Sequence, residues 1–270
     1  MDLSIIILNY NTKNLLRECL RALRLARPEI KMEILVIDND SADGSAAMVL
    51  SEFPEARLIR APRNLGYAGG NNLGIKSAVG RYIMIMNPDI LVFPGSLESF
   101  LSFMEANPGV GIAGPQLINP DGSIQYSCYR FQTPFTPLYR RTAIGLLPFG
   151  RRAVKDYLME DFDHRSVSDV DWLLGGALLV RRSALETVGL LDENFFMYFD
   201  DTDWCSRFWE NGWRVAYAPV SRFVHFHQRH SQGGVIELLR KRTARMHLLS
   251  AYRYFRKYHG KNNPRREATN

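Results

Sequence analysis

Strand-like and helix-like patterns alternate through the first 115 residues, and this alternation restricts the possible folds more than any other feature. Short β-branched and apolar runs occupy residues 4–8, 33–37, 56–60 and 81–86. Between them, apolar spacings of three and four residues predict a helix from Leu15 to Leu23, a short helix after Ser45 and a third helix over residues 68–78. This order predicts an α/β fold with a Rossmann-like, mostly parallel central sheet flanked by helices.

Polar side chains gather where the predicted strands end. They are Asn9, Tyr10 and Asn11 after the first strand, Asp38 at the end of the second, Asn64 after the third, and Asn87 and Asp89 at the end of the fourth. Ligands of open α/β sheets bind beyond the carboxyl ends of the strands. A carboxylate at this rim suits a divalent cation that bridges nucleotide phosphates, although Asn-Pro-Asp is also a common turn signal.

The regular alternation ends after a predicted helix over residues 94–106 and a strand over 110–113. Residues 119–170 contain four prolines and many aromatic and arginine residues, which predicts a long irregular segment. We expect residues 123–165 to form either a mobile loop over the site or a static packing segment. Further predictions are one buried strand over 172–181, a capping box from Ser183 to Glu186, short strands over 214–218 and 222–226, and a helix over 234–258.

Three acids lie at the start of another predicted amphipathic helix. If Asp201 opens that helix, its apolar stripe consists of Trp204, Cys205, Phe208 and Trp209. Asp203 is then predicted to pair with Arg207 on the solvent-exposed face, whereas Asp201 points toward apolar surroundings that disfavour its charged form. Asp201 is therefore a candidate general base. The alternative is that Asp200 and Asp201 are only an N-cap and a first-turn acid.

Composition narrows the class of protein. At 270 residues and 46% apolar content, the chain is long enough for a substantial core, and its longest apolar runs are too short to cross a bilayer. Residues 1–4 lack a basic region, so no secretory signal is expected. Cys19, Cys128 and Cys205 are odd in number and widely spaced, as expected of core thiols in a reducing compartment. The expected location is the cytoplasm.

The C-terminal region is strongly basic. Lys and Arg greatly outnumber acids between residues 229 and 266, and leucines and tyrosines alternate with the positive charges. This composition suits an interfacial helix on the anionic inner face of the plasma membrane, and it equally suits an ordinary packed helix with a solvated basic face. Nucleic-acid binding is not expected, because no recognised motif accompanies the charge.

Histidines and glycines offer weaker signals. His225 or His227 could supply a second metal ligand from a strand, although a lone histidine there is more often a satisfied core residue. The glycines at positions 66, 69, 70 and 74 lack both the dinucleotide-binding spacing and the Walker lysine. Neither a Rossmann dinucleotide site nor a P-loop is therefore predicted.

The order of the motifs resembles family-2 glycosyltransferases of the GT-A fold, and within them the rhamnosyltransferase-like branch. The motifs are Ile7-Leu-Asn-Tyr-Asn11, Val36-Ile-Asp-Asn-Asp-Ser41, Asn64-Leu-Gly-Tyr-Ala-Gly-Gly-Asn-Asn72, Asn87-Pro-Asp89, Trp172-Leu-Leu-Gly175 and Asp192-Glu-Asn-Phe-Phe-Met-Tyr-Phe-Asp-Asp-Thr-Asp203. The resemblance covers residues 3 to about 260. The chain departs from the family pattern where Asn87 replaces the first acid of the Asp-x-Asp motif and where Asp200 replaces a glutamate.

The resemblance implies a role for each motif. Asp201 is the base that activates the acceptor, with Asp200 and Asp203 in support, and Asp38 contacts the nucleotide base. Asp89 is the remaining acid of the Asp-x-Asp motif and holds Mg²⁺ or Mn²⁺, with His225 completing the metal site. The donor-binding set is Asn9, Tyr10, Asn11, Asp38, Asn64, Gly70, Asn71, Asn87 and Asp89. Trp172 and Gly175 are the acceptor-binding residues.

The activity implied by the resemblance is inverting transfer of a sugar from a nucleotide diphosphate, expected to be dTDP-L-rhamnose, with UDP-sugars as the alternative. The expected acceptor is a saccharide, free or linked to a polyprenyl diphosphate, in surface polysaccharide synthesis. We expect one catalytic domain over residues 1–233, with a nucleotide-sugar half (1–115) and an acceptor half (116–233). A basic amphipathic helix (234–262) with possible peripheral membrane contact and a tail (263–270) follow. A pyrophosphorylase and a non-catalytic nucleotide-sugar-binding protein remain less favoured alternatives.

Overall fold

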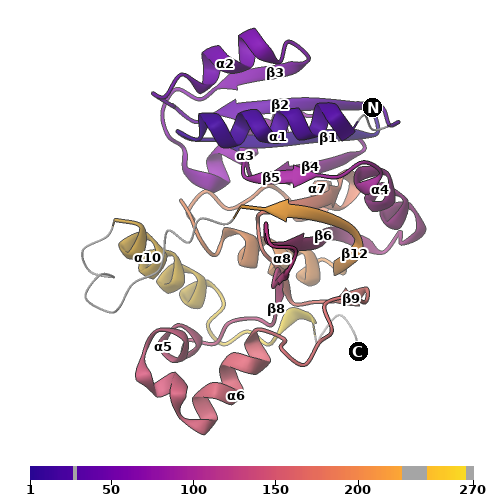
Figure 1. Ribbon diagram of the computed structural model, residues 1–270. Coiled ribbons are helices and arrows are strands. Elements are labelled where there is room, and N and C mark those ends of the chain that lie inside the picture. The colour runs from indigo at the N-terminus through magenta and orange to yellow at the C-terminus, as the bar shows by residue number, and fades with distance from the viewer. Residues whose placement is uncertain (27–28, 227–241, 266–270) are drawn as a thin grey trace.

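The computed structural model describes residues 1–26, 29–226 and 242–265, and it contains one large mixed sheet covered by helices (Figure 1). The strands are β1 (Leu3–Asn9), β2 (Met32–Asp38), β3 (Ala56–Arg60), β4 (Tyr82–Met86), β5 (Ile90–Val92), β6 (Val110–Ile118), β7 (Ile124–Gln125), β8 (Cys128–Tyr129), β9 (Ser168–Asp169), β10 (Trp172–Leu173), β11 (Ala177–Arg181) and β12 (Arg214–His225). The helices are α1 (Lys13–Ala26), α2 (Ser45–Glu52), α3 (Gly66–Ser77), α4 (Ser96–Ala106), α5 (Thr136–Arg141), the 3₁₀ helix η1 (Ala143–Leu146), α6 (Pro148–Tyr157), α7 (Arg182–Val188), α8 (Asp200–Glu210) and α10 (Arg242–Lys257).

The strand order is β3-β2-β1-β4-β11-β6-β12-β5. The pairs β3-β2, β2-β1 and β1-β4 are parallel, as the alternation predicts, and β11 is inserted antiparallel between β4 and β6. Strand β12 runs parallel to β6 and antiparallel to β5. The predicted α/β class, with a central sheet flanked by helices, is confirmed.

Both faces of the sheet are buried, which explains why its strands are continuously apolar. Ile5 and Ile7 of β1 face a core shared with α1, α2 and α4. Ile6 faces the opposite core, which contains α3, α7 and α8. Cys19, Cys128 and Cys205 are buried free thiols. No helix among the described residues is long and apolar enough to cross a membrane.

Several local predictions are wrong. Residues 119–170 are not irregular, because they contain short strands and the helices α5, η1 and α6. The predicted strand over 172–181 is split into β10 and β11 by a turn at Gly175 and Gly176. Helix α7 begins without a capping box, since its N-cap residue, Arg181, makes no side-chain cap hydrogen bond.

The C-terminal part of the sheet also differs from its predicted pattern. The two short strands predicted over 214–226 form the single strand β12, whose register shifts between Ala218 and Arg222 around Pro219. Proline lacks the N–H group that a regular ladder needs. Strand β5 was not predicted. Of the predicted C-terminal helix, residues 234–241 lie outside the described part of the chain, as does His227, and α10 ends at Lys257.

Candidate active site

A hydrogen-bonded network joins the carboxyl ends of β1 and β2. The Asn9 side chain is fully buried and donates from Nδ2 to Asp38 Oδ1 at 3.3 Å and to Ser41 Oγ at 3.0 Å. Asn39 Nδ2 donates to Asn64 Oδ1 at 3.1 Å, which connects β2 to the segment before α3. Tyr10, at the end of β1, is 48% exposed. The strand-end residues therefore meet at one rim, as the sequence predicts.

A cavity of about 260 Å³ opens beside this network. Its walls include four residues predicted to bind the donor: Tyr10, Asn64, Asn87 and Asp89. Pockets at this edge of an open α/β sheet are the usual ligand sites. Two other predicted donor-binding residues lie on α3: Asn71 is buried and donates to Tyr67 O, and a Cβ atom on Gly70 would lie 2.3 Å from Leu8 Cδ1. Gly70 thus permits close packing of α3 on β1.

Asp89 and His225 are brought together by the pairing of β5 with β12, in which Ile90 lies opposite His225. His225 Nε2 lies 3.4 Å from Asp89 Oδ1, and that oxygen is buried with no hydrogen-bond partner in the described structure. His225 Nδ1 lies 2.8 Å from Gln125 Oε1, so a proton on Nδ1 would donate to Gln125. A neutral imidazole of this tautomer presents Nε2 toward the carboxylate as a metal ligand does.

These two side chains fit a divalent cation, since a buried carboxylate oxygen without a donor and an imidazole nitrogen are both metal ligands. The described residues contain no group of three or more His, Cys, Asp or Glu side chains that could hold a metal ion. Two protein ligands leave most of the coordination sphere open to the oxygens of a bound diphosphate.

The turn between β10 and β11 connects the Asp89–His225 pair to the acids of α8. Gly176 O accepts from Asn87 N at 2.9 Å, and a Cβ on Gly176 would lie 3.5 Å from the His225 ring. Gly175 N donates to Asp201 Oδ2 at 3.0 Å, while its carbonyl accepts from Tyr67 Oη. A Cβ on Gly175 would come within 2.9 Å of Tyr67 Oη. Glycine at position 175 therefore lets the turn approach Tyr67 and Asp201 closely, whereas a Cβ at Gly176 would make an ordinary van der Waals contact.

Asp200 and Asp201 begin α8 in different environments. Asp200 is 4% exposed, whereas Asp201 is half-buried and accepts from the N–H groups of Gly175 and, at 2.8 Å, Thr202. Burial raises the pKa of Asp201 to about 6, against the opposing effect of these two hydrogen bonds. Burial, with the Asp201 charge beside it, raises the pKa of Asp200 well above its usual range. Near neutral pH, Asp201 is the member of the pair that ionises and can accept a proton.

Asp203 is not on a solvent-exposed face, so that part of the prediction is wrong. Its pairing with Arg207 is present at 2.9 Å, but the Asp203 side chain is fully buried because α10 covers it. Lys257 Nζ lies 2.7 Å from Asp203 Oδ1, and Tyr258 Oη donates to the same oxygen at 3.0 Å. A pattern within one helix cannot reveal that a distant helix covers its polar side. Asp203 thus anchors α10 to α8.

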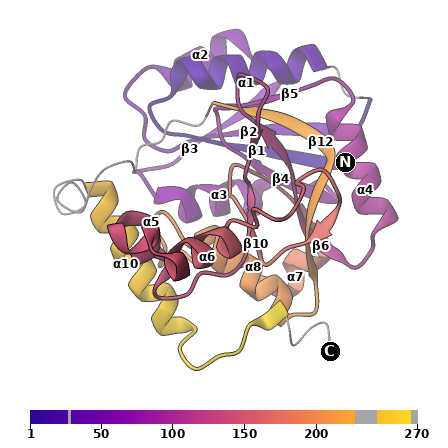
Figure 2. The same ribbon diagram turned by 60° about the horizontal axis from the view of Figure 1, so that its bottom comes forward.

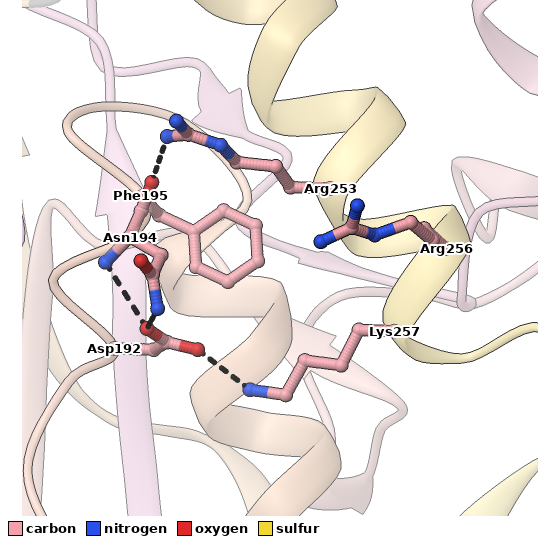
Figure 3. A pocket seen from close by; sticks show the side chains of 6 residues that line it. All are labelled: Asp192, Asn194, Phe195, Arg253, Arg256 and Lys257. Carbon is pink, nitrogen blue, oxygen red and sulfur yellow. Dashed lines mark hydrogen bonds and ion pairs between the residues drawn. The ribbon is translucent and has the colours of Figure 1, made fainter.

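A second cavity, of about 300 Å³, lies along this contact and contains none of the predicted site residues among the six that line it (Figure 3). Lys257 reaches across it to Asp192, at 2.8 Å, and Arg253 donates to the carbonyl of Asn194 (Figure 3). These bonds hold α10 against the segment that leads into the acids.

Trp172, predicted to bind the acceptor, is 5% exposed. Its indole donates to Arg130 O at 2.8 Å and its ring stacks on Tyr129, with centroids 4.6 Å apart. Tyr157 also stacks on Tyr129, with a centroid distance of 5.4 Å, and its ring centroid lies 6.4 Å from that of Trp172. Trp172 therefore belongs to an aromatic cluster that it forms with Tyr129 and Tyr157.

Sequence reasoning missed Tyr67, Gln125 and Gly176 as parts of the site. Tyr67 stands inside the Asn64–Asn72 motif, and Gly176 directly follows Gly175, so both had a local signal. Gln125 had none, because only the pairing of β7 with β6 brings it to His225.

Comparison with known proteins agrees with this geometry. Residues 4–160 match the family described as Glycosyl transferase family 2. The chain is 32% identical over 245 residues to N-acetylglucosaminyl-diphospho-decaprenol L-rhamnosyltransferase of Mycobacterium tuberculosis, covering 86% of this chain and 78% of that protein. It is 25% identical over 228 residues to a low-salt glycan biosynthesis hexosyltransferase of Haloferax volcanii, covering 83% and 67%.

Two solved structures share the fold. A mannosyltransferase of Pyrobaculum calidifontis, in complex with GDP-Man and Mn²⁺, superposes with a TM-score of 0.62 at 19% identity over 99% of this chain and 68% of that one. GalNAc-T7, with UDP, GalNAc and Mn²⁺, gives 0.64 at 16% identity, over 84% of this chain and 44% of that one. With the family match and the rhamnosyltransferase relative, the chain is a glycosyltransferase that belongs to glycosyl transferase family 2.

Proposed function

We propose that this enzyme transfers L-rhamnose from dTDP-L-rhamnose to a saccharide carried on a polyprenyl diphosphate, with inversion at the anomeric carbon. The name of the Mycobacterium tuberculosis rhamnosyltransferase describes such a lipid-linked acceptor. Its alignment with this chain covers most of both proteins. The single structural observation that carries the chemistry is the Gly175–Gly176 turn, which contacts Asn87 on the donor side and the Asp201 carboxylate on the other.

In the proposed reaction, Asp201 accepts the proton of an acceptor hydroxyl as that oxygen attacks the anomeric carbon. The bond to the departing diphosphate breaks on the opposite face, so one displacement inverts the configuration. The Gly175 and Thr202 N–H groups fix the carboxylate, and its pKa of about 6 keeps it ionised yet basic near neutral pH. Asp200, more deeply buried, stays protonated and places no second charge beside the base.

On the donor side, we assign recognition of the nucleotide base to Asp38, which accepts a hydrogen bond from Asn9, and Tyr10 and Asn64 line the adjoining cavity. Asp89 and His225 are the residues that would hold Mg²⁺ or Mn²⁺. When bound there, the cation would act as a Lewis acid on the leaving diphosphate.

The first test is donor specificity. Purified enzyme with Mn²⁺ is incubated with dTDP-L-rhamnose, with UDP-sugars and with GDP-mannose, and slow donor hydrolysis is followed by chromatography. Selective hydrolysis of dTDP-L-rhamnose supports the proposal, whereas selective use of a UDP-sugar replaces the donor and retains the mechanism. Transfer to a synthetic polyprenyl-diphosphate acceptor, followed by NMR of the anomeric proton, then tests inversion. A product that retains the donor's configuration refutes single displacement.

A further inference from the structure

The hairpin formed by α5, η1 and α6 has an unusually apolar outer surface. Over residues 135–149 it exposes large apolar side chains by 39 to 66% each: Phe135, Leu138, Ile144, Leu146, Leu147 and Phe149. Single exposed apolar residues are common on soluble proteins, but a cluster of this kind in one short segment marks an interaction surface.

The charge of the same hairpin is mostly positive. Residues 133–157 contain four arginines and one lysine against a single acid, Asp156. Arg151 and Arg152 are exposed on α6, and Lys155 pairs with Asp161 at 2.7 Å just beyond the hairpin. Exposed apolar side chains among arginines are suited to the boundary between anionic lipid headgroups and acyl chains.

The hairpin is stabilised by packing contacts within it and with the rest of the protein. A Cβ on Gly150 would come within 2.4 Å of Ile144 O, so α6 packs tightly against η1. Tyr157, at the end of α6, is buried against Tyr129, and Arg130 N donates to its carbonyl at 3.1 Å. The exposed apolar side chains therefore lie on a hairpin that is fixed to the rest of the protein.

Helix α10 extends this surface. It lies beside α5 in both views of the molecule (Figures 1 and 2). Its outer stripe exposes Leu248, Leu249 and Tyr252 by 46%, 49% and 62%, with Arg245 and Arg256 on the same stripe. The spacing of these residues is that of one helix face.

We propose that the α5–η1–α6 hairpin, together with the outer stripe of α10, binds the surface of an anionic lipid bilayer. A second copy of the chain is disfavoured as the occupant, because each hairpin carries five basic residues against the single acid Asp156, so two hairpins would bring mostly like charges together. The base of the hairpin is the aromatic cluster of Tyr129, Tyr157 and Trp172 on the acceptor side of the site. Bilayer binding would thus bring this side to a lipid-linked acceptor, a consequence that rests on the proposed function.

The test compares two matched double variants by vesicle co-sedimentation without substrates. L146E/L147E places two carboxylates in the hairpin, where the leucines are 66% and 47% exposed. L25E/L50E makes the same chemical change at leucines that are 76% and 61% exposed on α1 and α2. The vesicles are phosphatidylcholine with or without phosphatidylglycerol. Thermal unfolding and donor hydrolysis of each variant report whether it remains folded.

We expect L146E/L147E to weaken binding to the anionic vesicles on the order of tenfold or more, since about one leucine side chain of apolar contact is lost, while L25E/L50E binds like the wild type. R151Q/R152Q should weaken binding about tenfold or more on anionic vesicles, with little change on neutral ones. Equal binding by the two glutamate variants would overturn the proposal. A wild-type dimer that L146E/L147E converts to monomer, with vesicle binding unchanged, would instead make this face a dimer interface. Both results are independent of the donor and acceptor assignments.

Discussion

Replacing Asp201 by asparagine should stabilise the folded protein at neutral and alkaline pH. The pKa of Asp201 is about 6 in the folded state, against an ordinary value of 3.8. The folded state therefore binds this proton more tightly than the unfolded chain does. The contribution of protonated Asp201 to the free energy of unfolding is fully present below a pH of about 4. It falls as the pH rises and is lost above a pH of about 6. The difference between the two pKa values corresponds to ~3 kcal/mol.

The asparagine side chain of the variant does not ionise, so the variant does not lose stability as the pH rises from about 4 to about 6. We expect the free energy of unfolding of Asp201→Asn, minus that of the wild type, to be about 3 kcal/mol larger at pH ~8 than at pH ~4. Any constant loss from the changed hydrogen bonds to Gly175 and Thr202 cancels in this comparison. Relief of the neighbouring Asp200 adds to the effect, because the Asp201 charge raises its pKa.

The assay is urea unfolding, followed by tryptophan fluorescence, of the wild type and the variant at several pH values. Asp156→Asn is the matched control, since Asp156 is exposed and its carboxylate is solvated in both states. A stability difference between Asp201→Asn and the wild type that stays constant across the pH range would refute the claim that burial destabilises the charged carboxylate.

Three further outcomes are expected. Gln125→Leu removes the hydrogen-bond partner of His225. It should weaken Mn²⁺ binding in the presence of nucleotide about 10–100-fold, as measured by calorimetry. An unchanged affinity would show that His225 is not a metal ligand. Lys257→Met removes one partner of the buried Asp203 carboxylate and should lower the free energy of unfolding in urea by about 1–3 kcal/mol. Lys261→Met, at the exposed pair with Glu210, should lower it by under ~1 kcal/mol. Equal losses would contradict the stabilising role of the Asp203–Lys257 pair. The wild-type turnover number should fall about tenfold per pH unit below a pH of about 6 as Asp201 is protonated, and a flat profile would exclude a base of this pKa.

The part of the sheet formed by β1 to β4 could be predicted closely from the sequence, because these parallel strands alternate with helices along the chain. Parallel strands β1 to β4 end at one rim, so the polar residues after each strand had to meet there. Asp38, Asn64 and Asp89 accordingly lie along one edge of the sheet.

The rest of the structure depends on contacts between segments far apart in the sequence, which local patterns do not contain. Strand β11 inserts antiparallel between β4 and β6, and this insertion brings the Gly175–Gly176 turn to the rim. The burial of Asp203 requires Lys257, the last residue of α10, and Tyr258 directly after it, both about fifty positions later in the chain. Helix periodicity predicted the pairing of Asp203 with Arg207, but it wrongly assigned Asp203 to the solvent-exposed face, because it could not show which distant helix covers that acid.

The most direct test of the central claim is a comparison of turnover and donor binding in Asp201→Asn. The account predicts that the turnover number falls about 10²–10⁴-fold, because the acceptor proton loses its base, while the dissociation constant for the nucleotide-sugar changes little, because Asp38, Asn64 and Asp89 are untouched. A turnover number equal to that of the wild type would contradict the assignment of Asp201 as the base.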